Sequence, residues 1–165
     1  MNLINKSILF IDNSNSDFTG YDINTPKVRG TESSLILLAE SFVKKNISVR
    51  VLTEIDNEIL CNGVIYSNKH KHLDHDYNLC IAISNANLFD NIKSDKKIVW
   101  SNSLQPFEKF LRKKQLIPFL KYKPEVVTMC NYQYNNRSFL TSMFGKHMIS
   151  LSVLSLIHIS EPTRH

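Results

Sequence analysis

Polar and small residues follow the first apolar run of the chain. The run "SILFID" (7–12) is continuous and ends on Asp12, as expected for a strand buried on both faces. Ser14 follows it, and Arg29-Gly30-Thr31 stands directly before an amphipathic segment. Carboxylates and hydroxyls bind ligand hydroxyl groups, and the start of a helix offers N–H groups to phosphate. The sequence therefore predicts a polar ligand site after the first strand.

The segment around Gly30 has two interpretations. In the first, Gly30 adopts backbone angles closed to other residues and leaves room for a phosphate, while Arg29 adds a charge-assisted contact. Thr31 is then the expected N-cap of the helix. Glu32 opposes an anion, so backbone donors would have to dominate. In the second, Gly30 only makes a turn and Glu32 only stabilises the helix start. A loop with a single glycine does not decide between them.

Strands and helices that alternate along the chain must position these residues. Beyond 7–12, apolar runs at 48–53, 77–84, 96–102 and 124–130 predict strands. Helical patterns cover 31–45 and 106–120, with Pro118 expected to end or bend the second, and a short helix near 138–144 precedes a strand at 146–152. The segment 59–67 holds Asn62-Gly63 and is either a hairpin or a strand start. The alternation predicts an α/β domain with a mainly parallel sheet, whose strand ends share one edge.

A histidine-rich segment suggests metal binding. It places His70, His72, Asp74, His75 and Asp76 within seven residues. Structural zinc sites usually draw their ligands from separated elements with typical spacings, and no Cys-x-x-Cys or His-Glu-x-x-His motif is present. We expect a solvated loop and no metal.

The net charge of +5 is unevenly distributed. Residues 1–105 carry 11 Lys/Arg against 12 Asp/Glu, and residues 106–153 carry 8 against 2. Within 107–123, basic residues alternate with apolar ones, so the segment either packs its apolar side on the core or rests on anionic lipid. The membrane-surface candidates are Lys109, Arg112, Lys113 and Lys114. No nucleic-acid fold signature accompanies them, so we expect no nucleic-acid partner.

Length and cysteine usage favour one cytoplasmic domain. A chain of 165 residues with 42% hydrophobic residues can bury one good core. Cys61, Cys80 and Cys130 are odd in number, and the last two lie in apolar runs, which predicts buried, reduced thiols. The first apolar stretch is too short for a signal peptide, and no stretch has the length of a membrane span.

The final residues, 154–165, have an unusual character. From Leu154 to Arg164 they resemble the translation of a transposase adapter used in sequencing libraries, so we expect 154–165 to be a non-native tail outside the fold. We expect the native protein to continue past about Val153. A genuine terminal strand is the alternative.

The ordered motifs "ILFIDNS", "PKVRGTES", "LILLAESFVKK", "NISVRVLTE" and "VWSNS" carry a family resemblance. In this order they resemble the N-terminal half of a GT-B glycosyltransferase, in the retaining group 1 or family 4 enzymes. Three positions depart from the family pattern. Arg29 replaces the first glycine, Asn46-Ile47 replaces Gly-His, and Asn102 stands where relatives often have histidine.

The resemblance implies a Rossmann-like, three-layer, acceptor-binding domain over residues 1–153. It implies a nucleotide-sugar substrate, a glycan or lipid-linked acceptor, no metal or other cofactor, and a peripheral position on the inner membrane face. The donor diphosphate would meet Arg29, Gly30 and Thr31, and the acceptor cleft would include Asp12, Ser14, Asn102 and Ser103. The donor-binding second domain is not in this sequence, so we expect no turnover by this chain. The alternative is a self-contained, flavodoxin-like binding or regulatory domain with a basic peripheral-membrane surface.

Overall fold

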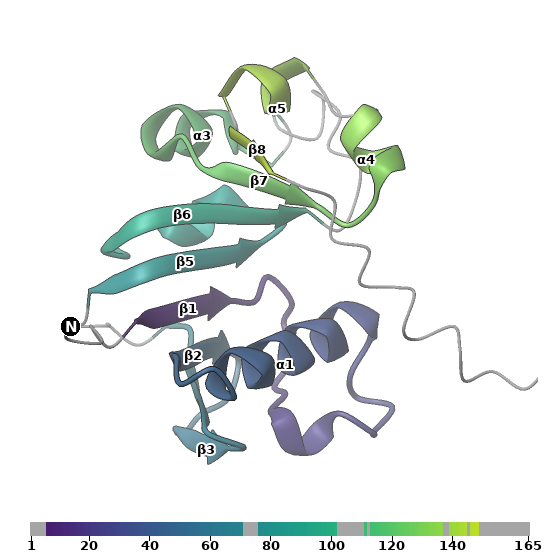
Figure 1. The fold of residues 1–165 in the computed structure, drawn as a ribbon, viewed down its shortest axis with the longest axis vertical. Coiled ribbons are helices and arrows are strands. Elements are labelled where there is room, and N and C mark those ends of the chain that lie inside the picture. Colours follow the sequence, from purple (N-terminus) through teal and green to yellow (C-terminus); the bar gives the residue numbers. More distant parts are fainter. Residues whose placement is uncertain are drawn as a thin grey trace, which may run out of the picture.

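An eight-stranded sheet forms the centre of the protein (Figure 1). The computed structural model describes residues 6–70, 76–101, 111, 113–136, 139–144 and 146–148. The strands are β1 (Ser7–Ile11), β2 (Ser48–Thr53), β3 (Ile59–Cys61), β4 (Val64–Asn68), β5 (Tyr77–Ile83), β6 (Ser94–Ser101), β7 (Glu125–Thr128) and β8 (Lys146–Met148). The α-helices are α1 (Gly30–Val43), α3 (Leu116–Tyr122), α4 (Asn131–Asn135) and α5 (Phe139–Phe144), and 3-10 helices are η1 (Gly20–Asp22) and η2 (Ala86–Phe89). The predicted α/β class is confirmed.

The strand order places the switch point of the sheet beside β1. The order is β3-β4-β2-β1-β5-β6-β7-β8, and every neighbouring pair is parallel except β3 and β4. Without β3, this is the 3-2-1-4-5-6 order of a doubly wound sheet, extended by β8. It differs from the 2-1-3-4-5 order of flavodoxin-like sheets. The chain thus moves outward from β1 in both directions, and the switch point lies between β1 and β5.

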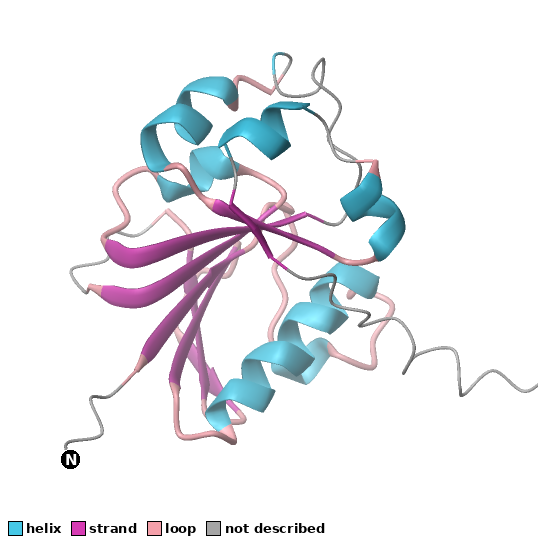
Figure 2. Ribbon diagram, turned by 45° about the horizontal axis from the view of Figure 1, so that its top comes forward, coloured by secondary structure: helices cyan, strands magenta, loops and turns pink. Residues whose placement is uncertain are grey.

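Two apolar cores cover the two faces of the sheet. On one face, α1 packs Leu35, Ile36 and Ala39 against alternate residues of the strands, such as Phe10 and Val51. On the other face, η2 and α3 contribute Phe89 and Phe119 to a second cluster. Figure 2 shows α1 and α3 on opposite sides of the twisted strands. Helix layers on both faces explain why the strands are continuous apolar runs.

The start of α1 differs from its prediction. Arg29, with extended backbone angles of φ −94° and ψ 175°, is the N-cap, and its side chain makes no capping hydrogen bond. Thr31 therefore lies inside the helix, and its prediction as N-cap was wrong. Gly30 is the first helical residue and is not among the residues of positive φ. The expectation that Gly30 adopts angles closed to other residues was also wrong, because the chain turns before it.

The segment 59–67 is a hairpin. Asn62 and Gly63 join β3 to β4 with φ values of 49° and 79°. Two successive positive φ values are the mark of a type I′ turn, whose twist suits two paired antiparallel strands. This confirms the hairpin alternative.

The last third of the fold contains two corrections. Pro118 lies in the first turn of α3, where its missing N–H has no intrahelical partner, so it neither ends nor bends that helix. Cys130 follows β7 and is the N-cap of α4, and it is half-buried rather than in a strand core. Cys61 and Cys80 are buried free thiols, and burial raises the pKa of Cys80 to about 12.

Candidate functional site

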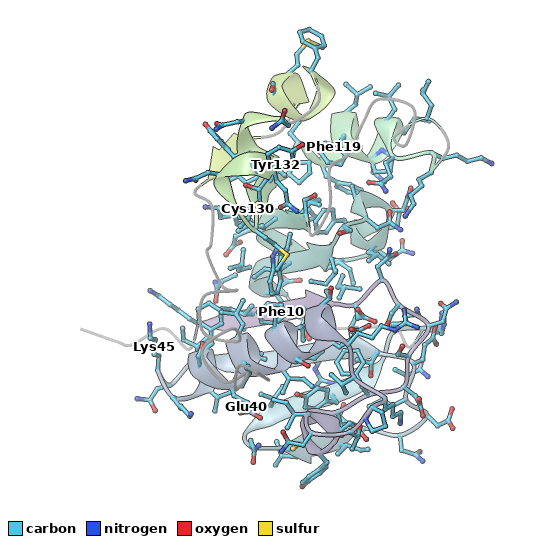
Figure 3. The ribbon with its side chains drawn as sticks, turned by 90° about the vertical axis from the view of Figure 1, so that its right-hand side faces the viewer. Phe10, Glu40, Lys45, Phe119, Cys130 and Tyr132 are labelled. Atoms are coloured by element: carbon cyan, nitrogen blue, oxygen red, sulfur yellow. The ribbon has the colours of Figure 1, made fainter. Side chains whose placement is uncertain are left out.

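Buried polar side chains mark the carboxyl edge of the sheet. In Figure 1, the arrowheads of β1, β5, β6 and β7 point to the right, and Figure 3 views the molecule from that side. The strands β4, β2, β1, β5, β6 and β7 are neighbours in this order, and each ends at or next to a buried polar residue. In the same order these residues are Ser67, Thr53, Asp12, Ser84, Ser101 and Thr128. The buried polar residues of these strands therefore gather at the predicted edge, whereas Asp95, Lys96 and Lys97 near the amino end of β6 are exposed or half-buried.

Asp12 occupies the end of β1 at the switch point. Only 2% of its surface is exposed. The Ser14 N–H donates to Asp12 Oδ2 at 2.9 Å, and the Ser14 hydroxyl donates to the same oxygen. Burial raises the pKa of Asp12, the bonds from Ser14 oppose the rise, and the charge of Glu32 adds to it. The two predicted residues Asp12 and Ser14 thus form one unit.

A hydrogen bond joins the loops on the two sides of the switch point. Asn85, after β5, donates from Nδ2 to Oδ1 of Asn13 at 3.0 Å. Ser84 has a φ of 54°, and its N–H donates to the carbonyl of Trp100 at 2.9 Å. Buried Gln115 donates from Nε2 to the carbonyl of Ser84 at 3.4 Å. The first bond joins the β5 loop to the β1 loop, and the other two hold the β5 loop to β6 and to the start of α3.

Lys69 anchors the β1 loop from the other side. Its Nζ donates to the carbonyl of Ser14 at 2.9 Å and pairs with Glu54 Oε1 at 2.5 Å. Hydrogen bonding to Lys69 lowers the pKa of Glu54. His70 Nε2 lies 3.1 Å from the other oxygen of Glu54.

The histidine-rich segment is only partly described. His70 pairs with Glu54, and exposed Asp76 precedes β5 at the amino edge of the sheet. His72, Asp74 and His75 lie outside the described residues. Within the described part of the chain, no group of three His, Cys, Asp or Glu side chains is arranged to hold a metal ion.

Hollows among the described residues include two near the sheet. One, of about 320 Å³, lies between the β1 loop and residues 54–59. Its carboxylates include Asp17, paired with Lys27 at 3.0 Å, and Asp22, which accepts from the Thr19 N–H at 2.8 Å. The other, of about 730 Å³, lies at the amino ends of the strands and includes Arg50 in its lining. It is at the opposite end of β1 from Asp12 and does not correspond to the predicted site.

The predicted loop lies at the same edge as Asp12, because α1 begins where the β1 loop ends. Arg29 and Gly30 are exposed, and Thr31 is half-buried. Asn102, Ser103, Lys109 and Arg112 lie outside the described residues, whereas Lys113 and Lys114 are exposed before α3. Sequence reasoning missed Asn13 and Asn85 as a pair, and it placed Glu32 only at a helix start. The positions of Asn13 and Asn85 directly after predicted strands were the available signal for that pair.

Together these features define a doubly wound α/β protein with a polar site at its switch point. No protein-family model, curated protein or solved structure matches this chain. Among the described residues, no helix has the length and apolar character needed to cross a membrane.

Proposed function

We propose that this chain is the acceptor-side half of a GT-B retaining glycosyltransferase, which moves a sugar from a nucleotide-sugar donor to a glycan or lipid-linked acceptor. The strand order supports this, because open α/β sheets bind ligands at the switch point. The observation that carries the proposal is the buried carboxylate of Asp12 at that point. A carboxylate accepts hydrogen bonds from hydroxyl groups, and sugars present several of them.

Asp12 and Ser14 orient the acceptor in this proposal. Among the described residues, both hydrogen bonds that Asp12 accepts end on Oδ2, which leaves Oδ1 to a ligand hydroxyl. The bond between Asn13 and Asn85 fixes the flanking loops before the ligand arrives. Preorganised loops reduce the entropy lost on binding. Asn102 and Ser103 belong to the same proposed cleft.

The start of α1 is the proposed contact for the donor. Arg29 and Gly30 are exposed beside Thr31, and the N-terminus of a 14-residue helix attracts phosphate through its N–H groups. The donor itself would be held by a companion domain that closes over this edge. No metal or other cofactor is part of the proposal.

The experiment for the acceptor role is binding of the full chain to an array of neutral oligosaccharides. We expect binding to a subset of the array, loss of binding in Asp12→Asn, and no turnover of nucleotide sugars. Asp76→Asn is the matched control, because it makes the same chemical change on an exposed residue at the opposite edge. An array without signal for the wild type would refute the acceptor role and favour a self-contained binding or regulatory domain.

A lipid-linked acceptor would place the chain on the inner membrane face, and α3 offers a surface for it. Ile117 is 74% exposed and Leu120 is 45% exposed. Exposed Lys113 and Lys114 precede the helix, and Lys109 and Arg112 belong to the same proposed surface. Each basic residue near anionic headgroups contributes about 1 kcal/mol.

Cosedimentation with lipid vesicles tests this surface. We expect the protein to bind vesicles of phosphatidylcholine with phosphatidylglycerol and to leave pure phosphatidylcholine unbound. The variant Lys113→Glu/Lys114→Glu should lose most of the binding. The control variant Lys44→Glu/Lys45→Glu changes an exposed lysine pair that follows α1, where Figure 3 labels Lys45. This variant should bind the vesicles as the wild type does. Equal loss in both variants would refute a specific surface on α3.

A further inference from the structure

Two of the buried polar atoms that have no hydrogen-bond partner among the described residues lie on the α1 side of the carboxyl edge. They are Glu32 Oε2, in the first turn of α1, and Thr53 Oγ1, at the end of β2. Glu32 is 4% exposed and Thr53 is fully buried. Buried polar groups in folded proteins nearly always have a partner, so each unpartnered one requires an explanation.

The sheet register brings Thr53 beside Asp12. The Asp12 N–H donates to the carbonyl of Leu52 at 3.0 Å, which continues the β1–β2 pairing by one residue. Val49 and Val51 pack on the α1 side of the sheet, so Thr53, two residues further along, lies on that side as well. Phe10 packs on the same side and places Asp12 there by the same alternation.

Glu32 approaches the same point from the helix. It is the first buried residue of α1, ahead of Ser34 and Leu35. Since α1 packs on the same side of the sheet as Phe10 and Val51, buried Glu32 lies on the side that also carries Asp12 and Thr53. Its charge is one of the smaller causes that raise the pKa of Asp12, in agreement with that placement. A glutamate in the first turn can extend into water, and Arg29 and Gly30 just before it are exposed. Its burial without a partner therefore indicates a group that the ligand supplies.

The side chains of Asp12, Glu32 and Thr53 indicate the chemistry of that ligand. Two carboxylates repel phosphate and other anions, and they accept hydrogen bonds from hydroxyl groups. The Thr53 hydroxyl can donate or accept. We propose that Glu32 and Thr53, beside Asp12, form a binding site for the hydroxyl groups of a neutral sugar. The inference rests on the proposed acceptor function and adds the residues that select a neutral ligand over an anionic one.

Saturation-transfer NMR with methyl glycosides of glucose, galactose and mannose tests the site in the full chain. We expect at least one glycoside to bind the wild type and Glu32→Gln to weaken that binding about tenfold, since a hydrogen bond to a charged group is lost. Thr53→Val should weaken it several-fold. Glu40→Gln is the matched control, because Glu40 lies on the same helix and accepts from Asn62 Nδ2 at 2.8 Å, away from Asp12.

Two further measurements guard against a purely structural role. Glu32→Gln replaces a buried carboxyl group whose Oε2 has no partner among the described residues, so its thermal midpoint should equal or exceed that of the wild type; a lower midpoint would overturn the inference. Inorganic phosphate should not displace the glycoside, and displacement would also overturn it.

The outcomes separate the inference from the proposed function. Unchanged binding in Glu32→Gln together with loss in Asp12→Asn would refute the inference and leave the acceptor function standing. Absence of binding by the wild type to every glycoside would refute both.

Discussion

Asn85 and Asn13 lie 72 positions apart in the sequence, and a 3.0 Å hydrogen bond between their side chains joins the two loops of the switch point. Asn85 also accepts from the Asn87 N–H at 3.1 Å and so caps η2. This pair couples the β1 loop, which carries Asp12 and Ser14, to the β5 half of the sheet. The ligand edge is therefore a connected structure rather than two independent loops.

Substitution of Asn13 tests this connection. Asn13→Ala removes the acceptor and should lower the free energy of unfolding by about 1 kcal/mol. Asn13→Asp keeps an acceptor for the Asn85 amide and should retain most of the stability. Urea denaturation of the three proteins measures both effects. Equal losses in the two variants would show that the bond contributes nothing.

Two glycines should respond in opposite ways to alanine. A Cβ at Gly20 would lie 2.8 Å from Cys61 Sγ and 3.3 Å from Tyr66 Oη, so Gly20→Ala should cost about 1–3 kcal/mol. A Cβ at Gly30 would meet nothing within 4 Å, and Gly30→Ala should be neutral or stabilising by up to about 1 kcal/mol.

Calorimetric midpoints of the two alanine variants measure this difference. Adding Cys61→Ala to Gly20→Ala should restore part of the loss, because the nearest atom is then gone. A destabilised Gly30→Ala would mean that Gly30 is needed for the backbone.

Asp12 should make stability depend on pH in a defined direction. Its pKa in the folded protein is above the ordinary 3.8, so its contribution to stability is present below pH 3.8 and is lost as the pH rises through the folded-state pKa. The free energy of unfolding of the wild type minus that of Asp12→Asn should therefore fall between pH 3 and pH 7.

Glu54 is a control, because its contribution to stability should change with pH in the opposite direction. Lys69 lowers its pKa from 4.5, so its contribution is present above pH 4.5 and is lost as the pH falls through the folded-state pKa. The difference between the wild type and Glu54→Gln should rise with pH over the same range. Slopes of equal sign for the two variants would contradict the assigned environments.

The three thiols should differ in reactivity. Cys130 is half-buried at the carboxyl edge, where Figure 3 shows it above Phe10. Burial raises the pKa of Cys61 and Cys80, so both thiols lack the reactive thiolate and are also shielded. With Ellman's reagent, we expect one thiol to react in the native protein and three in urea. Cys130→Ser should abolish the reaction in the native protein. A second thiol that reacts in the native protein would contradict the burial of Cys61 and Cys80.

Local pattern determined most of the elements. Continuous apolar runs predicted β1, β2, β5, β6 and β7, and Asn62-Gly63 allowed a hairpin, because burial on both faces and positive φ leave direct marks on residue types. The helix α4 was not predicted, since "NYQYN" has no apolar periodicity; in the structure its Gln133 side chain accepts from the Met129 N–H at 2.9 Å. The start of α1 was misread at Thr31, because Arg29 carries no capping side chain that a pattern could reveal.

The sequence by itself determined the α/β class and the accumulation of polar residues at strand ends, because both follow from alternation along the chain. The tertiary structure alone decided that β5 lies beside β1, which pairs Asn85 with Asn13, and that β2 lies on the other side of β1, which places Thr53 beside Asp12. Such neighbours depend on which strands pair across long loops. Strand pairing is chosen by the packing of the whole core, and no local sequence period encodes it.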